Sequence, residues 1–177
     1  MMTTAQRRDD GMTLVELIIA VLVSGVFLTL IALIFGSGLS AQQRATERDA
    51  ATAQLNAATA LITETVRNSS DIRVSAAGTR LDARFLKSDG STWECRAWQL
   101  LSNELRFSAG PSARPVASTT WKSLGSELSG TLTSGAAFTQ SGKRLSLGLE
   151  QSQGQTKIAV SNGAVAQIVM AGGPACW

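Results

Sequence analysis

Residues 11–35 read GMTLVELIIAVLVSGVFLTLIALIF. From Met12 to Phe35 this run is almost continuously apolar, and a helix of about 20 such residues crosses the hydrocarbon core of a membrane, which is about 30 Å thick. The one ionisable residue in the run is Glu16. A carboxylate inside an apolar span is costly unless it is neutralised or paired. The stretch therefore predicts a membrane helix in which Glu16 needs a cationic partner.

The start of this stretch resembles the N-terminal processing motif of type IV pilins and type II secretion pseudopilins. Gly11 is followed by MTLVE (residues 12–16) and then by the long apolar run. The resemblance implies that a prepilin peptidase removes residues 1–11 on the cytoplasmic side and that the new N-terminal residue, Met12, is N-methylated. It also implies that Glu16 pairs with the N-terminal amine of a neighbouring subunit in a fibre. Such a pair would neutralise two charges that are each costly in an apolar bundle, and it would set the register between subunits.

Two plainer interpretations of the same stretch stay open at this point. A secretory signal has an apolar core of roughly 7–15 residues followed by small residues, and residues 36–40 (GSGLS) would serve as a cleavage site. An ordinary single-pass anchor is as long as this run, but it seldom places an ionisable residue inside the span. The glycine at position 11 and the carboxylate at position 16 favour the pilin-type interpretation.

The composition argues against several function classes. The chain has 177 residues and a net charge of +3, and its scattered basic residues form no cluster suited to a nucleic-acid backbone. It contains no histidine, which is the commonest general base and metal ligand. Its serines therefore have no histidine to activate them. Four carboxylates could be imagined as a catalytic pair, but they are expected mostly on turns and solvent faces: Asp71, Asp82, Asp89 and Glu94. We predict a protein that is not an enzyme and that holds no metal or cofactor.

Four segments follow from the composition along the chain. Residues 1–11 are a polar leader, residues 12–35 the membrane and assembly helix, residues 36–70 its amphipathic continuation, and residues 71–177 a β-rich domain. The leader carries two arginines, and positive residues before a span favour keeping that end in the cytoplasm. We therefore predict a single-pass protein of the cytoplasmic (inner) membrane, with its N-terminus inside and the β-rich domain outside.

Beyond the apolar run, residues 40–68 predict a further stretch of helix. They contain no proline and no glycine and are rich in Ala, Gln, Glu and Arg. At helical spacing they carry an apolar stripe, which would face a packed domain: Leu55, Ala58, Ile62 and Val66. The polar residues 68–71 indicate where this helix stops.

From Ile72 onward, short alternating runs are separated by clusters of Gly, Ser, Asn and Asp, a pattern typical of strands. Asp89-Gly90 indicates a hairpin. The expected strands are residues 79–86, 92–101, 103–107, 143–150 and 156–161, one around Phe138 and a last candidate at 165–170. Residues 121–128 are ambiguous between a turn of helix and irregular chain. The fold class predicted is α+β: a long helix packed on one antiparallel sheet of about four to six strands, a pilin-like roll.

The two cysteines, Cys95 and Cys176, lie far apart in the sequence. Outside the cytoplasmic membrane conditions favour oxidation, so an even count suggests a disulfide that ties the C-terminal tail to a strand. Many pilins end with such a bridge, and the resemblance therefore adds to this prediction. Two free thiols remain the alternative.

A looser resemblance, to minor pilins and J-like minor pseudopilins, extends over residues 98–149. The order of its cues is WQL (98–100), NELR (103–106), WKSL (121–124), Phe138 and the leucine-rich strand at 145–149. This resemblance implies a structural subunit of a type IV pilus or a type II secretion-like fibre. Its implied partners are other pilin subunits, the prepilin peptidase and methyltransferase, and an inner-membrane assembly platform.

The alternative function is a membrane-anchored binding module for adhesion or DNA uptake. It would present an aromatic surface built from the four tryptophans of the chain: Trp93, Trp98, Trp121 and Trp177. Use of these side chains in the core or in subunit contacts is the more common arrangement.

Overall fold

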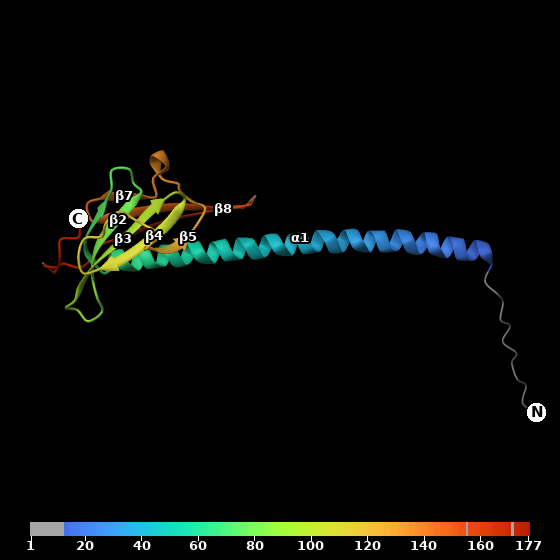
Figure 1. Ribbon diagram of the computed structural model, residues 1–177, viewed down its shortest axis with the longest axis horizontal. Coiled ribbons are helices and arrows are strands. Elements are labelled where there is room, and N and C mark those ends of the chain that lie inside the picture. The colour runs from blue at the N-terminus through green and yellow to red at the C-terminus, as the bar shows by residue number, and fades with distance from the viewer. Residues whose placement is uncertain (1–12, 155, 171) are drawn as a thin grey trace, which may run out of the picture. The chain divides into compact units, whose positions relative to one another are not determined.

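The computed structural model describes residues 13–154, 156–170 and 172–177. Within them one α-helix, α1 (Leu14–Arg67), precedes nine strands and a short 3₁₀ helix, η1 (Thr133–Gly135) (Figure 1). The strands are β1 (Ser69–Val74), β2 (Arg80–Leu86), β3 (Trp93–Leu101), β4 (Glu104–Gly110), β5 (Lys122–Gly125), β6 (Leu128–Gly130), β7 (Phe138–Ser141), β8 (Arg144–Gln153) and β9 (Thr156–Val165). The chain divides into two compact units, of which the first ends at Ala45 and the second is Thr46–Trp177.

The part of α1 inside the second unit has the amphipathic pattern that the sequence predicts. All four residues of the expected stripe are buried, and Ile62 and Val66 are fully so. Glu64 and Arg67, on the other side, are exposed. The helix ends at Arg67, close to the predicted stop, but β1 begins only two residues later. The first strand expected from the sequence was residues 79–86, so β1 was missed: residues 69–71, which were assigned to the end of the helix, are its first three residues.

The strands form two antiparallel sheets, and the prediction of one sheet is wrong. The first sheet has the order β1-β2-β3-β4-β5, and in the second β8 pairs with β6, β7 and β9. The sheets separate at Glu127, whose φ of 56° lies in the left-handed region and turns the chain between β5 and β6. Residues 121–128 therefore supply β5 and the start of β6, where the sequence left a helical turn or irregular chain open.

Two hairpins join neighbouring strands, and the first of them matches the turn predicted at Asp89-Gly90. Leu86 pairs with Trp93 across the loop that contains Asp89-Gly90, and Gln153 pairs with Thr156 at the tip of β8 and β9. The last candidate strand, at 165–170, is wrong beyond Val165. The backbone N–H groups of Gln167 and Ile168 donate instead to the carbonyls of Arg67 and Ser69, because the chain leaves β8 and crosses to the end of α1.

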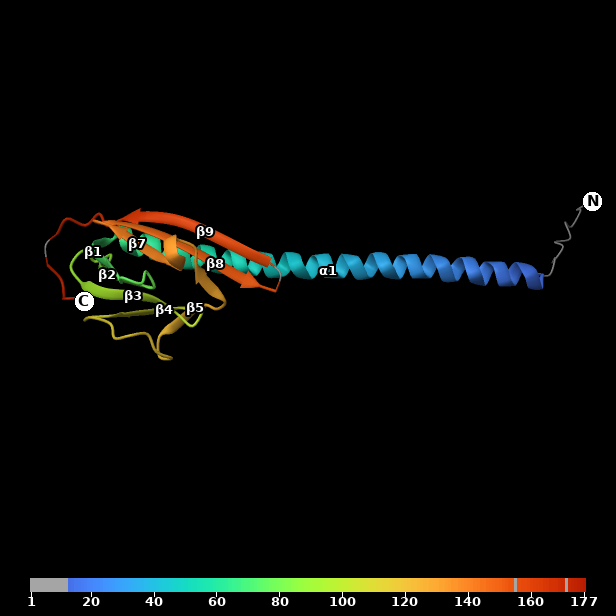
Figure 2. The ribbon, with the colours of Figure 1, turned by 90° about the horizontal axis from the view of Figure 1, so that it is seen from above.

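One hydrophobic core lies between the second half of α1 and both sheets (Figure 2). Its largest fully buried side chains are Leu55, Ile62 and Val66 from α1, Leu81, Trp98 and Leu105 from the first sheet, and Phe138, Leu145, Leu147 and Leu149 from the second. Burying a side chain of this size contributes roughly 1.5–3 kcal/mol, so these ten dominate the favourable side of folding. The predicted α+β class, a long helix packed on antiparallel strands, is confirmed.

Candidate assembly and processing site

The first turn of α1 is capped from within the predicted processing motif. Thr13 precedes the helix, and its Oγ1 accepts the backbone N–H of Glu16 at 3.3 Å, while its carbonyl accepts the N–H of Leu17 at 3.1 Å. Thr13 and Glu16 have the T-x-x-E spacing of a capping box. A carboxylate in the first turn also interacts favourably with the positive end of the helix dipole. Sequence reasoning missed the capping role of Thr13, although this spacing is its signal.

The helix surface that follows is apolar and uncovered. Each large hydrophobic side chain from Leu14 to Phe35 is between 38% and 76% exposed. Within the described ranges α1 is the helix long and apolar enough to cross a membrane, and its most apolar part is not buried by any other described residue. A surface of this kind needs lipid or other apolar helices around it.

The polar side chains in this part of α1 differ in whether they have a partner within the helix. Three hydroxyls donate to carbonyls of their own helix: Thr29 to Gly25 at 2.8 Å, Ser37 to Ile34 at 2.8 Å and Ser40 to Gly36 at 3.0 Å. These side chains are satisfied without any partner from outside. The carboxylate of Glu16, by contrast, makes no ion pair with any described residue.

Of the predicted processing and assembly residues, the structure describes Glu16. Gly11 and Met12, the expected cleavage and methylation positions, lie outside the described residues. Glu16 is exposed in the first turn of α1. The two cysteines lie in the second unit, so they are a separate feature of the protein.

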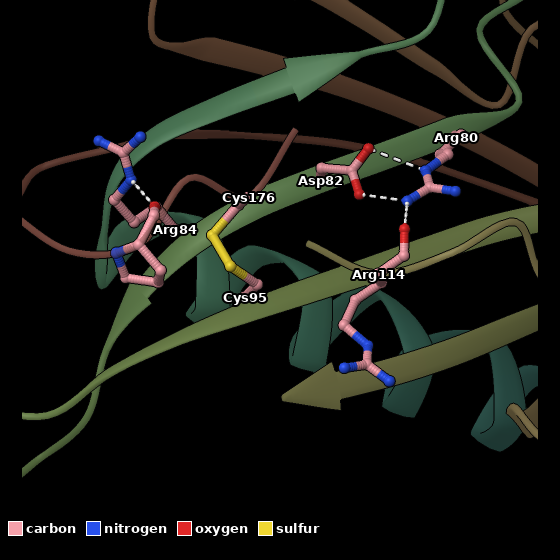
Figure 3. Close-up of a disulfide and its surroundings, with 7 residues drawn as sticks. Arg80, Asp82, Arg84, Cys95, Arg114 and Cys176 are labelled. Carbon is pink, nitrogen blue, oxygen red and sulfur yellow. Dashed lines mark hydrogen bonds and ion pairs between the residues drawn. A yellow bond between two sulfur atoms is a disulfide. The ribbon is translucent and has the colours of Figure 1, made fainter. Parts of the chain in front are cut away.

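The predicted bridge between Cys95 and Cys176 is present (Figure 3). The two Cα atoms are 5.3 Å apart, across a sequence separation of 81, and both cysteines are 1% exposed. Beside the bridge, Arg84 Nε donates to the carbonyl of Pro174 at 3.0 Å. Two independent contacts therefore hold the C-terminal tail against the first sheet, on strands β3 and β2.

A second irregular segment is held against the same sheet by Arg80. Its guanidinium makes a two-point pair with Asp82, at 2.9 and 2.8 Å, and donates to the carbonyl of Arg114 at 2.7 Å (Figure 3). It also donates to the carbonyl of Pro115 at 2.9 Å. The Cζ atom of the same guanidinium lies 5.7 Å from the centroid of the Trp121 ring. Arginine is suited to this role because its fixed fork of donors reaches a carboxylate and neighbouring carbonyls together.

The carboxylates considered as a catalytic pair are each engaged separately. Asp71 accepts the N–H of Ile72 at 2.9 Å, Asp82 pairs with Arg80, and Glu94 pairs with Arg96 at 2.9 Å. Asp89 accepts backbone N–H groups in its own turn. Across the described ranges no group of three or more His, Cys, Asp or Glu residues is placed to hold a metal ion.

Two of the surface carboxylates have a lowered pKa. Hydrogen bonds from Thr92 and Ser91 in the β2–β3 turn lower the pKa of Asp89 from 3.8 to about 2. At the start of β4, a hydrogen bond from the Ser123 hydroxyl and then the neighbouring Arg106 lower the pKa of Glu104. Both groups are ionised at neutral pH and stabilise local geometry, so neither has the raised pKa expected of a general acid.

The four tryptophans do not form one aromatic surface. Trp98 is fully buried in the main core, and Trp121 is 5% exposed in a smaller cluster with Ala97 and Ala117. Trp93 is half-buried, and Trp177 is 39% exposed with Arg84 lying 5.3 Å from its ring. Two of the four side chains therefore stabilise the domain and are closed to a ligand.

Comparison with known proteins bears on the N-terminal part of the chain. Residues 6–32 match the family model described as the prokaryotic N-terminal methylation motif. Neither the comparison with curated proteins nor that with solved structures gives a match. The matched range includes Gly11, Met12 and Glu16, and the α+β architecture is consistent with the pilin fold. The motif suggests a structural subunit rather than an enzyme, and the apolar helix fits anchoring in the inner membrane. Residues 6–32 carry the signature of type IV pilins and pseudopilins, and they support assigning the chain as a precursor of that type.

Proposed function

We propose that the protein is a minor pilin or minor pseudopilin, a low-copy initiating or tip subunit of a type IV pilus or a type II secretion-like fibre. A prepilin peptidase cuts after Gly11, and the new N-terminal residue Met12 is N-methylated. The mature subunit is anchored in the inner membrane with its β-rich domain outside, and it then assembles into the fibre by packing its N-terminal helix against those of other subunits. Each of these steps extends the coarser assignment that the methylation motif supports.

One observation carries this proposal: the first part of α1 is an uncovered apolar surface whose single ionisable side chain is Glu16. In a fibre core, such a helix would bury its apolar side chains against neighbouring helices. An isolated carboxylate would then be costly, and pairing with a neighbour's N-terminal amine would remove most of that cost. Cleavage after Gly11 is required in this scheme, because it creates the amine on Met12.

The proposed sequence of events also follows from the segments of the chain. Residues 1–11 are a cytoplasmic leader, residues 12–35 anchor the protein in the membrane, residues 36–70 extend the helix and residues 71–177 remain outside. The tight attachment of the tail and of residues 114–115 to the first sheet supports a role as a durable extracytoplasmic building block. Energy for extrusion would come from a separate ATPase on the assembly platform, since this chain contains no nucleotide-binding motif.

The experiment that tests the processing step is mass spectrometry of the N-terminus of the protein recovered from membranes. The expected result is a chain that begins at N-methylated Met12 when the prepilin peptidase is present and at Met1 when it is absent. A chain that begins at Met1 in both cases would leave a plain anchor. A chain that begins near Leu39 would indicate a secreted domain, and either result would overturn the proposal.

A further inference from the structure

Strand β9 forms one edge of the second sheet, and its outer side is not paired with any described strand. It contains ten residues, pairs with β8 from Thr156 to Val165, and has no second strand among the described residues. The strand contains no proline, and its one charged residue is Lys157. Long edges with so little charge are sites where another strand adds, and proteins usually protect them.

The direction of the free backbone groups follows from the pairing. The N–H of Ala166 donates to the carbonyl of Lys143, one position beyond the last β8–β9 pair, so residue 166 points toward β8. Since backbone direction alternates along a strand, residues 157, 159, 161, 163 and 165 point away from β8. The N–H of Gly163 agrees with this assignment, because it donates to the side-chain Oδ1 of its neighbour Asn162 at 2.7 Å. Lys157, Ala159 and Ser161 are exposed and offer their backbone groups to an incoming strand.

The other sheet edges are short or capped. On β1, the side chain of Gln140 accepts the N–H of Val74 and donates to the carbonyl of Ile72, both at 2.9 Å, and Ile168 donates to the carbonyl of Ser69. Three further strands lie at or near an edge, and each has only three or four residues: β5, β6 and β7. The open edge of β9 is thus an exception to how the rest of the domain is finished.

A basic pocket lies at the C-terminal end of this edge. It has a volume of about 340 Å³ and is lined by Gly163 and Val165 of β9 together with Arg67 and Arg144. Both arginines are exposed, and neither makes an ion pair with a described residue. Most of the other arginines of the domain are bound to carboxylates, carbonyls or, for the last one, a serine hydroxyl: Arg80, Arg84, Arg96, Arg106 and Arg114. Two guanidiniums without counter-ions beside an unpaired strand edge are suited to bind a carboxylate of a strand that adds to this edge.

We propose that the edge of β9 accepts an extended segment of another protein chain by strand addition, with an acidic side chain of that segment held between Arg67 and Arg144. Backbone pairing with residues 157–161 supplies a sequence-tolerant part of the affinity, and the two arginines supply the preference for an acidic end. That the donor is a neighbouring subunit rests on the proposed function; the binding of an acidic strand to β9 does not.

The test uses the full-length chain in detergent micelles and two fluorescent synthetic peptides with blocked termini. Each peptide has about eight residues, the length of an ordinary strand, in alternating threonine and valine. One ends in two aspartates and the other in two asparagines; a second pair carries these residues at the other end, so that both strand orientations are covered. The dissociation constants are measured by fluorescence anisotropy. The expected result is that one aspartate peptide binds at least about tenfold more tightly than its asparagine partner.

Two variants separate the parts of the surface. Ser161→Pro removes an outward N–H and is expected to abolish binding, while Ser161→Ala, which keeps that N–H, binds as the wild type. Arg67→Glu combined with Arg144→Glu is expected to weaken binding of the aspartate peptide by about tenfold or more. Arg73→Glu is the matched control, since Arg73 is also exposed and makes no ion pair with a described residue.

Three outcomes would overturn the inference: no binding of any peptide, equal binding of aspartate and asparagine peptides, or unchanged binding by a folded Ser161→Pro variant. Folding of each variant is checked by thermal unfolding. Fibre assembly is measured separately with Glu16→Ala. If that variant assembles normally but the peptides still bind through β9, the proposed function fails and this inference stands.

Discussion

Arg84 donates from Nε to the carbonyl oxygen of Pro174 at 3.0 Å. Pro174 lies two residues before Cys176, which forms the disulfide with Cys95. A side chain of β2 and a cysteine of β3 therefore hold the same short tail. The ring of the final residue, Trp177, lies 5.3 Å from the same guanidinium. This arrangement closes the C-terminus onto the first sheet and leads to the first prediction.

Replacing Cys95 and Cys176 together by alanine is expected to lower the free energy of unfolding by about 4 kcal/mol. The reason is that the bridge closes a loop of 81 residues and restricts the unfolded chain. Guanidinium denaturation of the variant measures this change, and the wild type with reductant serves as the comparison. An unchanged midpoint in both cases would mean that the contacts of Arg84 suffice to hold the tail.

Glu16→Ala is expected to reduce incorporation into fibres by about a hundredfold or more, because it leaves a neighbour's amine without its partner, at a cost of about 3 kcal/mol. Insertion into the membrane should be unaffected. Fibres sheared from cells are compared with the membrane pool by immunoblotting. Glu16→Gln tests whether the charge is needed, and Glu64→Ala, at an exposed position of the same helix, is the control. Wild-type incorporation of Glu16→Ala would contradict the proposed pairing.

Ile62→Ala is expected to destabilise the domain by about 2–5 kcal/mol, because Ile62 is fully buried between α1 and the sheets and its truncation leaves a cavity. Glu64→Ala, two positions along and exposed, should change stability by no more than about 0.5 kcal/mol. Both values come from denaturant unfolding monitored by tryptophan fluorescence. Equal effects of the two substitutions would show that the helix does not pack as described.

Gly78→Ala and Gly142→Ala separate backbone strain from crowding. Both glycines have positive φ, at 66° and 58°, which costs an alanine roughly 1–2 kcal/mol. A Cβ on Gly142 meets open space, whereas one on Gly78 would lie 2.4 Å from Cβ of Ala136. Gly78→Ala should therefore be more destabilising, by about 1–3 kcal/mol beyond Gly142→Ala. Equal thermal shifts would mean that residues 131–137 move away at no cost.

The carboxyl group of Asp89 is expected to titrate at about 2 in the folded protein, from 3.8 in an unfolded chain. Since the pKa is lowered on folding, the stabilising contribution is present above pH 3.8 and is lost as the pH falls toward 2. NMR of the side-chain carboxyl carbon measures the pKa directly. Asp89→Ala should remove this part of the acid dependence and loosen the β2–β3 turn. A carboxyl that titrates near 4 would contradict the hydrogen bonds from Ser91 and Thr92.

Local patterns explain what sequence reasoning predicted well. The apolar run, the stripe from Leu55 to Val66 and the turn at Asp89-Gly90 depend on residues within a few positions of one another, so their period and turn chemistry are visible without a partner. The sheet division was missed because it depends on Glu127, an ordinary residue held at positive φ by the surrounding structure. A glycine or asparagine there would have signalled a positive φ, whereas a glutamate does not.

Local sequence patterns specify a long apolar helix with one carboxylate, its amphipathic continuation, an α+β domain and the two cysteines that can form a bridge. Helical period, span length and residue chemistry are properties of neighbouring positions, and they do not depend on how distant segments meet. The tertiary structure alone decided the division into two sheets, the use of Arg80 and Arg84 to hold irregular segments, and the open edge of β9 beside Arg67 and Arg144. These features arise from contacts between segments far apart in the chain, where each strand has several partners of similar pattern and packing selects among them.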